Sequence, residues 1–430
     1  MTAAVIERLR NAFDPAIFEE PSGIEVDGRE IIGQLSPRDV ESLCQVLALL
    51  NEQQIPVLIR GGGTRIGLGN CPDEVQVLLS TRSLSGVRRF EPDDGVVEVS
   101  AGTPLEEVRK AVLAKGWELP IDAGGSRATV GGAIACAAYG PRCLGFGPVR
   151  RNVLGLEVVN AAGTLTRCGG RVVKNVTGFD LAKIYTGSLG TLGVISGAWL
   201  RLQPKPRAIE VRVAEFSQTD QALASGIRVS RRSSARACVL LSPEVARRVG
   251  LEHSLAASWI LLAEFAGEAS ECRHDAAWFE TEMGANRPSV SSGDDALAMI
   301  DAVRDSLVAG PEVAGVRVRI AALGTKLESC IRPLTKAGAR MTVDPGLGLV
   351  FAEQAAGSGP GEVSAFIEVA RTAAQTVSGT LVLESVPSEF KRGIDVFGDE
   401  LGPELTLMRK LKEEFDPKRL LNPGRFVGGI

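Results

Sequence analysis

The sequence predicts an α+β protein with two or three domains. Its 430 residues are more than one hydrophobic core usually serves. Short apolar runs typical of strands alternate with amphipathic, capped helices through the first two hundred residues. The segment Gln203-Pro204-Lys205-Pro206 then interrupts this pattern, and its two prolines predict a domain boundary near residue 206.

The first half of the chain is expected to alternate helices and strands. An apolar face within residues 5–13 favours a short first helix, and Ser36-Pro37 has the form of an N-cap followed by the first helical residue. The segment 103–106, Thr-Pro-Leu-Glu, matches a capping box, so a helix is expected from there to Lys115, ending at Gly116. The strands expected in this half are residues 57–59, 75–79, 96–99, 156–160, 164–167 and 198–202.

The second half has a less regular pattern. Strand-like runs at 237–241 and 260–264 stand among alanine-rich helical stretches up to about residue 378, without a repeat of fixed period. The last fifty residues are more ordered, with a strand expected at 380–383 and a helix from about 403 to 415.

Bulk composition excludes several classes of protein. The formal net charge of −4 and the pI near 5.6 argue against a chain whose whole surface grips nucleic acid. The longest apolar runs, such as 259–263, are far shorter than the roughly 20 residues of a membrane span. The N-terminus lacks the apolar core and cleavage site of a secretory signal. We therefore expect a cytoplasmic protein, with docking on a larger assembly at the inner face of the membrane left open.

Cysteine and histidine usage argues against a metal centre. None of the eight cysteines forms a C-x-x-C pair, so no four-cysteine zinc or iron–sulfur site is expected, and free thiols are. The two histidines, His253 and His274, cannot form an H-E-x-x-H motif, and both are expected to be solvated.

Three glycine clusters, at 61–63, 124–132 and 187–193, are the main functional signal. They match neither the G-x-G-x-x-G dinucleotide fingerprint, nor a Walker A loop, nor a G-x-S-x-G nucleophile elbow. Glycine allows a ligand to approach the main chain closely, and successive N–H groups in such turns bind anions. The clusters predict a backbone cradle for a pyrophosphate; any one of them alone is equally explained as a tight turn.

The residues around these clusters carry a resemblance to a known family. The segments 59–64 (Ile-Arg-Gly-Gly-Gly-Thr), 128–134 (Ala-Thr-Val-Gly-Gly-Ala-Ile) and 187–195 (Gly-Ser-Leu-Gly-Thr-Leu-Gly-Val-Ile) resemble the FAD loops of the vanillyl-alcohol-oxidase/PCMH flavoproteins. Within that superfamily the chain is most similar to the FAD-binding E subunits of bacterial glycolate oxidases (glycolate dehydrogenases). The further segments that resemble this family are 140–142, 149–150, 174–180, 408–417 and 422–426.

The resemblance implies a PCMH-type FAD domain of two α/β lobes at 1–205 and an α+β cap with an antiparallel sheet at 206–378. Residues 379–430 would return to the FAD domain. It implies non-covalent FAD, because no histidine precedes residue 253 and neither Cys136 nor Cys143 matches a linkage motif. The residues implied to bind FAD are Arg60, Gly61, Gly62, Gly63 and Thr64 at the pyrophosphate; Gly124, Thr129, Val130, Gly131 and Gly132 along the pyrophosphate and ribitol; Gly190, Thr191, Gly193, Val194 and Ile195 towards the other phosphate and adenine; and Arg425.

The activity implied by the resemblance is oxidation of glycolate to glyoxylate within a complex. A catalytic flavoprotein subunit and an iron–sulfur subunit would be the partners, and a small 2-hydroxy acid the substrate. Related catalytic subunits use histidines and an acidic residue to hold a metal, and this chain departs from that pattern. The first hypothesis is therefore that it carries FAD without a complete hydroxy-acid site of its own.

Two alternatives remain open from the sequence. A self-sufficient FAD-linked dehydrogenase, for example for D-lactate, could hold its substrate with cationic side chains near the flavin. The candidates are Arg142, Arg150, Lys174 and Arg425, each of which could instead be a solvated charge or loop anchor. A scaffold that has kept the fold without flavin is the non-enzymatic alternative.

Overall fold

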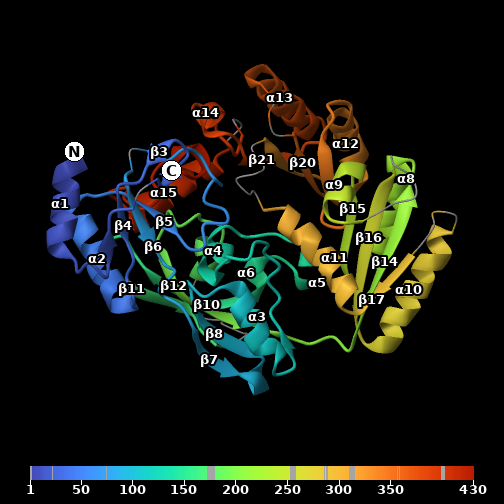
Figure 1. Cartoon of the computed structure of the whole chain (residues 1–430), viewed down its shortest axis with the longest axis horizontal. Coiled ribbons are helices and arrows are strands. Elements are labelled where there is room, and N and C mark those ends of the chain that lie inside the picture. Colours follow the sequence, from blue (N-terminus) through green and yellow to red (C-terminus); the bar gives the residue numbers. More distant parts are fainter. Residues whose placement is uncertain are drawn as a thin grey trace. The chain divides into compact units, whose positions relative to one another are not determined.

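The computed structural model describes residues 2–21, 23–73, 75–171, 180–251, 258–284, 286, 289–308, 315–355, 357, 359–398 and 402–430. The chain forms two compact units. The first unit comprises Met1–Ala138, Pro148–Pro204 and Lys391–Ile430, and the second comprises Tyr139–Gly147 and Lys205–Phe390. Each unit is described by itself below (Figure 1).

The first lobe of the first unit contains a four-stranded sheet in the order β1-β4-β6-β5. The pairs β4–β6 and β5–β6 are parallel, whereas β1 pairs with β4 antiparallel. An apolar core lies between this sheet and two helices, and it includes Leu9, Leu43 and Leu47, all almost fully buried. The elements are α1 Thr2–Ala12, β1 Phe18–Glu19, β2 Glu25–Val26, β3 Arg29–Glu30, β4 Gly33–Leu35, α2 Val40–Gln53, β5 Val57–Arg60 and β6 Val77–Ser80.

The second lobe contains a five-stranded antiparallel sheet in the order β11-β10-β12-β8-β7. A separate core joins this sheet to α3 and α4. The elements are β7 Val87–Glu91, η1 Pro92–Asp94, β8 Val96–Ser100, α3 Leu105–Leu113, β9 Trp117–Glu118, α4 Val130–Ala135, α6 Val149–Asn152, β10 Val153–Val159, β11 Leu165–Gly169, α7 Leu181–Tyr185, β12 Val194–Arg201 and β13 Gln203–Pro204.

Both predicted helices are present, but their predicted N-caps, Ser36 and Thr103, are wrong. Helix α2 begins after Asp39, whose carboxylate accepts from the backbone N–H of Ser42, so Asp39 is the N-cap and Ser36 is not. No side-chain cap precedes α3, because the Thr103 hydroxyl oxygen accepts from the backbone N–H of Gly86 (2.9 Å) instead. In both cases another polar group near the helix start takes the hydrogen bond that the predicted cap would have made.

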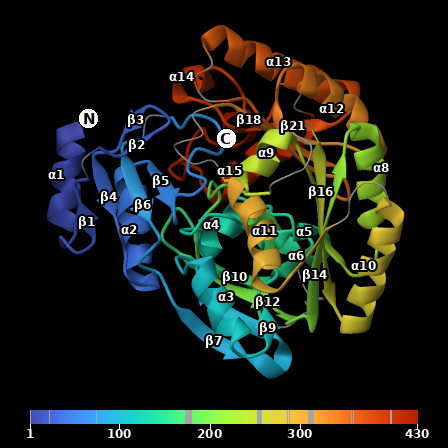
Figure 2. The ribbon, with the colours of Figure 1, turned by 45° about the vertical axis from the view of Figure 1, so that its right-hand side comes forward.

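The second unit is built on one eight-stranded sheet in the order β17-β14-β16-β15-β19-β20-β18-β21, with antiparallel pairing throughout. Figure 2 shows α8 and α10 beside β14 and β16, and α12 packs against α13. The elements are α5 Cys143–Phe146, β14 Ala208–Phe216, α8 Thr219–Val229, β15 Ala235–Leu241, α9 Pro243–Arg248, β16 Trp259–Gly267, α10 Ala269–Met283, β17 Ser289–Ser292, α11 Gly293–Ser306, β18 Arg317–Ala321, η2 Gly324–Lys326, α12 Leu327–Lys336, β19 Arg340–Asp344, β20 Leu349–Glu353, α13 Pro360–Thr376, β21 Thr380–Ser385 and α14 Ser388–Lys391.

The chain divides differently from the expected segments 1–205, 206–378 and 379–430. The break at Pro204 matches the first boundary to within a residue. Strand β21, however, pairs with β18 in the large sheet, so residues 379–390 belong to the second unit. Residues 139–147 also belong there, because α5 packs on β15.

The C-terminal segment from Lys391 belongs to the first unit and contains α15 Glu404–Phe415 and η3 Val427–Gly429. Its backbone joins the edge strand of the first lobe, where Val57 donates to the carbonyl of Leu420 (2.8 Å) and Asn422 donates to that of Val57 (2.9 Å). None of the helices in the described part of the chain combines the length and apolar composition needed to span a membrane.

Candidate functional site

A cavity of about 870 Å³, including its open mouth, lies entirely within the first unit. All three glycine clusters contribute to its wall, and the C-terminal segment closes the wall with Asn422 and Arg425. The predicted residues that line it are Arg60, Gly61, Gly62, Gly63, Thr64, Gly124, Thr129, Gly131, Gly132, Gly190, Gly193, Ile195 and Arg425. The fold thus brings together segments separated by more than a hundred residues, as the sequence predicts.

The first glycine cluster follows β5 and packs tightly against the second. A Cβ on Gly62 would lie 1.5 Å from the carbonyl oxygen of Arg127, and a Cβ on Gly61 would lie 2.3 Å from Oγ1 of Thr129. These contacts leave no room for side chains. The backbone of the loop is therefore the surface that a ligand meets.

Arg60 gives the first cluster a positive charge. Its guanidinium donates to Gln34 (2.8 Å) and is half-buried. Burial lowers the pKa of Arg60, and the neighbouring Arg82 and Arg127 lower it further. A site where three cations repel one another favours an anionic ligand.

The third cluster is fixed to the C-terminal segment. The Asn422 side chain accepts from the backbone N–H of Ile59 (2.7 Å) and donates to the carbonyl of Leu189 (2.6 Å). The buried Lys412 ammonium donates to the carbonyl of Thr191 (2.8 Å) and pairs with Asp416 (2.7 Å). Burial lowers the pKa of Lys412, whereas Asp416 raises it.

Arg425 lines the cavity, but its guanidinium forms hydrogen bonds with other residues of the protein. It pairs with Asp27 (3.3 Å) and donates to the carbonyls of Ile66 and Leu68. Lys391 donates to the same Asp27 (2.9 Å). Arg425 therefore holds the 66–68 loop from the cavity wall, and its contact with the cofactor stays a prediction.

Three predicted cofactor residues do not line the cavity. Val130 and Val194 are buried in the two apolar cores of the first unit. The Thr191 hydroxyl donates to the carbonyl of Ser188 (2.8 Å) and is fully buried. At these positions the side chain turns away from the ligand space, and the sequence signal lies in the neighbouring glycines.

The cationic candidates outside these clusters lie elsewhere. Arg142 belongs to the second unit and is paired with the fully buried Glu264 (2.9 Å) and with Asp301. Arg150 is exposed on α6, and His274 is exposed on α10. Lys174 and His253 fall outside the described residues.

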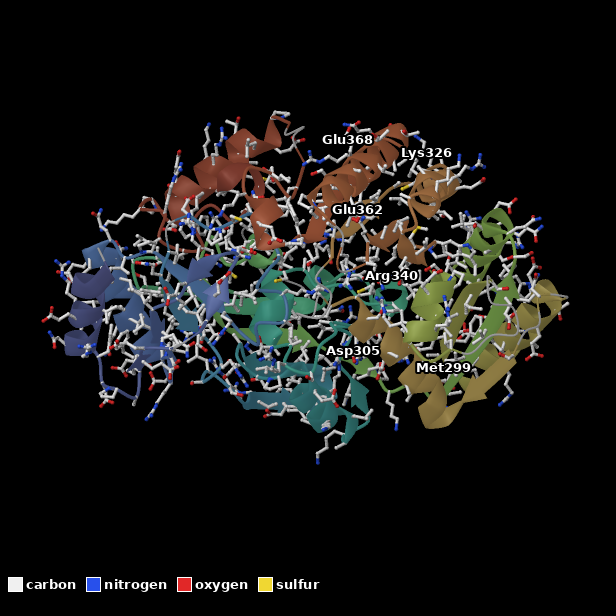
Figure 3. The ribbon with its side chains drawn as sticks, turned by 45° about the horizontal axis from the view of Figure 1, so that its top comes forward. Met299, Asp305, Lys326, Arg340, Glu362 and Glu368 are labelled. Carbon is white, nitrogen blue, oxygen red and sulfur yellow. The ribbon has the colours of Figure 1, made fainter. Side chains whose placement is uncertain are left out.

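Sequence reasoning missed a cluster of arginines in the second unit. Arg317 is 2% exposed, and its Nη2 donates to Glu353 (2.9 Å) and to the carbonyl of Ser306 (3.0 Å). Its Nη1 is buried without a hydrogen-bond partner in the described part of the chain. Arg317 lines a small cavity of about 180 Å³ with Arg248 and Arg340, the last labelled in Figure 3.

This arginine cluster carries an excess of positive charge. Glu353 forms ion pairs with Arg248, Arg317 and Arg340, so one carboxylate faces three cations. A buried donor without a partner is costly, and an anionic group in the cavity would satisfy it. Its three arginines are spread over residues 248–340, so no local sequence pattern pointed to the cluster.

The geometry of the first cavity fits FAD. Its wall is made of glycine loops whose main chain is open to a ligand, and its charged residues Arg60, Arg65 and Arg425 are all cations. Donors and positive charge are what a pyrophosphate requires when water is excluded. Groups of three or more side chains suited to a metal ion are absent from the residues described.

Comparison with known proteins agrees with this fit. Residues 33–169 match the family "FAD binding domain", and residues 393–426 match the family "FAD linked oxidases, C-terminal domain". The structure of a 4-ethylphenol oxidase from Gulosibacter chungangensis is similar, with a TM-score of 0.72, 15% identity, and coverage of 98% of this chain and 96% of that one.

Two curated relatives cover different shares of the chain. A D-lactate dehydrogenase of Archaeoglobus fulgidus is 29% identical over 424 residues, which is 91% of this chain and 90% of that protein. The glycolate oxidase subunit GlcE of Escherichia coli (strain K12) is 37% identical over 155 residues, which is 36% of this chain and 44% of that protein.

The first unit therefore contains a PCMH-type FAD-binding domain, and the mixed helices and antiparallel sheets confirm the predicted fold class. FAD is the cofactor, and the chain is a flavin-dependent oxidoreductase.

Proposed function

We propose that this protein carries non-covalent FAD for the oxidation of a small 2-hydroxy acid, with glycolate as the first candidate. In this proposal it is one subunit of a complex with a catalytic flavoprotein and an iron–sulfur protein. The similarity to a glycolate oxidase subunit supports this, although the chain matches less than half of that protein. All eight cysteines of the chain are free thiols in the structure, consistent with electron relay by another subunit.

One observation carries the subunit role. Among the residues that the structure describes, the cavity wall contains no histidine, aspartate, glutamate, lysine or tyrosine. Removal of the hydroxyl proton of a 2-hydroxy acid needs a base close to the substrate, and those side chains are the usual ones. FAD supplies the hydride acceptor when bound. The residues of the wall bind and orient this cofactor, and the proton transfer is assigned to a partner.

The absorption spectrum of the purified chain tests this proposal. We expect a yellow protein whose flavin is not bleached by glycolate or D-lactate under anaerobic conditions. Bleaching is expected only after the partner subunits are added. A colourless chain that does not take up added FAD would contradict the cofactor itself and favour a scaffold.

A self-sufficient 2-hydroxy-acid dehydrogenase, such as one for D-lactate, is the second candidate. Two observations favour it: the similarity over 90% of a D-lactate dehydrogenase, and the buried Nη1 of Arg317, which has no hydrogen-bond partner among the described residues. In this candidate the arginine cluster of the second unit binds the substrate carboxylate. The cavity of that cluster has free space for little more than one water molecule, so in this candidate its wall opens when the carboxylate binds.

Two variants separate the candidates. Arg317→Gln removes the donor without a partner, whereas Arg319→Gln removes an arginine of the same strand that pairs with Glu384 (2.7 Å). If the chain oxidises D-lactate alone, Arg317→Gln should raise KM by about tenfold, and Arg319→Gln should change it less than about threefold. An unchanged KM in Arg317→Gln would remove the cluster from this role.

A further inference from the structure

The side chain of Asn422 joins two glycine clusters that are far apart in the sequence. Its Oδ1 accepts from Ile59, 363 residues away, and its Nδ2 donates to Leu189, 233 residues away. Ile59 and Leu189 both line the FAD cavity, and Asn422 is 5% exposed. One amide group thus connects the start of the first cluster to the middle of the third.

The backbone around this connection is held in an unusual conformation. Leu189 and Asn422 have φ of +52° and +45°, in the left-handed region that non-glycine residues rarely adopt. Leu189 is also fixed by its own N–H, which donates to the carbonyl of Ala135 (2.9 Å) on the second cluster's side of the cavity. Such conformations persist only where surrounding contacts determine them, and they concentrate at ligand-binding sites.

Gly190 allows the close approach. A Cβ there would lie 3.0 Å from Nδ2 of Asn422 and 3.3 Å from Cδ1 of Ile59, and its φ is +72°. The third cluster is therefore packed directly on the Asn422 amide and on the strand that leads into the first cluster.

The C-terminal segment does not depend on this side chain to stay in place. Its backbone bonds with Val57, and the Lys412 ammonium bonds with the carbonyls of Thr191 and Leu421. Removal of the Asn422 side chain therefore loosens the two clusters while the segment stays attached.

We infer that Asn422 is a positioning residue: its amide sets the spacing of the first and third glycine clusters, and thereby the affinity for FAD. The inference rests on the cavity holding FAD. Asn422 acts through the main chain of both clusters, so its effect should appear in the cofactor-free protein as well as in binding.

Three variants of the full chain test this role. Asn422→Ala removes both bonds, whereas Asn422→Asp keeps the acceptor for Ile59 and loses the donor for Leu189. Asn70→Ala is the matched control, because Asn70 is also a buried asparagine but does not line the cavity. Its side chain bonds to the C-terminal segment: it donates to the carbonyl of Phe426 (3.0 Å) and accepts from the N–H of Val396 (2.8 Å).

The measurements are the Kd for FAD, from flavin fluorescence, and amide hydrogen exchange of the cofactor-free chain. Asn422→Ala should raise the Kd by about tenfold or more. It should also speed exchange at the Ile59 amide and at 187–193. Asn422→Asp should speed exchange at 187–193 only, and Asn70→Ala should leave both clusters protected and the Kd within about threefold.

Other outcomes overturn the inference. They are a wild-type Kd in Asn422→Ala, an equal loss of affinity in Asn70→Ala, or faster exchange throughout the unit instead of at the two clusters. If the wild-type chain binds no FAD, the cofactor assignment itself is refuted. The titration of the wild type distinguishes this outcome from a failure of the Asn422 inference.

Discussion

Two pairs of buried cations, one pair in each unit, use their hydrogen bonds differently. In the first unit, Lys412 and Arg425 each pair with one aspartate and give their remaining bonds to backbone carbonyls of loops beside the cavity. In the second unit, Arg142 and Arg236 both converge on Glu264, which is fully buried. The first arrangement shapes loops around a ligand space, and the second closes on itself within the sheet.

Because of this difference, we expect the loss of such a group to affect ligand binding in the first unit and folding stability in the second. A cation bound to backbone carbonyls determines where a loop lies, so its loss should mainly affect the ligand. A buried carboxylate between two arginines leaves uncompensated charges when it is removed, so its loss should mainly affect folding. Four variants separate effects on folding, expected for buried carboxyls of the second unit, from effects on FAD binding, expected at the cavity of the first unit, and they begin with the largest expected effect.

Glu264→Gln should cost about 3–5 kcal/mol of unfolding free energy, because Arg142 and Arg236 lose their shared counter-ion in the interior. Burial by itself would raise the pKa of Glu264, but Arg236 and Arg142 hold it below its usual value. Urea unfolding above pH 6 measures the loss. Asp301→Asn is the control, because Asp301 is 42% exposed and should cost less than about 1 kcal/mol.

Asp344 is a buried carboxyl paired with a hydroxyl rather than a cation. It accepts from Tyr139 (2.7 Å), and burial raises its pKa to about 6. The unfolded chain releases this proton near pH 4 and the folded chain near pH 6, so stability from this group is present below pH 4 and is lost as the pH rises to 6.

Asp344→Asn should remove the loss of stability that the wild type shows between pH 4 and pH 6. Between pH 4 and pH 7 the unfolding free energy of the variant should gain about 2 kcal/mol relative to the wild type. Urea unfolding at the two pH values measures the gain, and a constant difference would show that Asp344 does not titrate in this range.

Gly62→Ala should raise the Kd for FAD by about 100-fold or more, because its Cβ would lie 1.5 Å from the carbonyl oxygen of Arg127 and the first cluster must move. Gly67→Ala is the control in the same loop, since a Cβ there meets nothing within 4 Å. Equal affinities in the two variants would show that the cluster does not contact the cofactor.

Arg60→Gln should have the smallest effect, a rise in Kd of about tenfold at low salt that shrinks as salt is added. The reason is that Arg60 supplies charge beside a loop whose backbone supplies the donors. A titration of FAD at several salt concentrations measures this. Arg38→Gln, at an exposed position outside the cavity wall, should change the Kd less than about threefold.

The sequence predicted which segments form the cavity better than it predicted the roles of individual side chains. Glycine clusters at 61–63, 124–132 and 187–193 are local signals, and all three reach one cavity wall. Helix starts at Ser36 and Thr103 were predicted wrongly, because several polar groups compete for each cap.

The boundary expected at residue 378 also differed from the structure. Strand β21 finds its partner β18 sixty residues earlier in the chain, and a strand's pattern does not identify its neighbour.

By itself the sequence determined where the main chain has no side chains, because a glycine exposes the backbone at its own position whatever its neighbours are. Only the tertiary structure decided which buried polar groups meet. The Asn422 amide, the Asp27 carboxylate and the Arg317 guanidinium have roles set by residues that folding brings from distant parts of the chain. A hydrogen bond or ion pair acts over a few ångströms, so its partner is fixed by packing and not by position in the sequence.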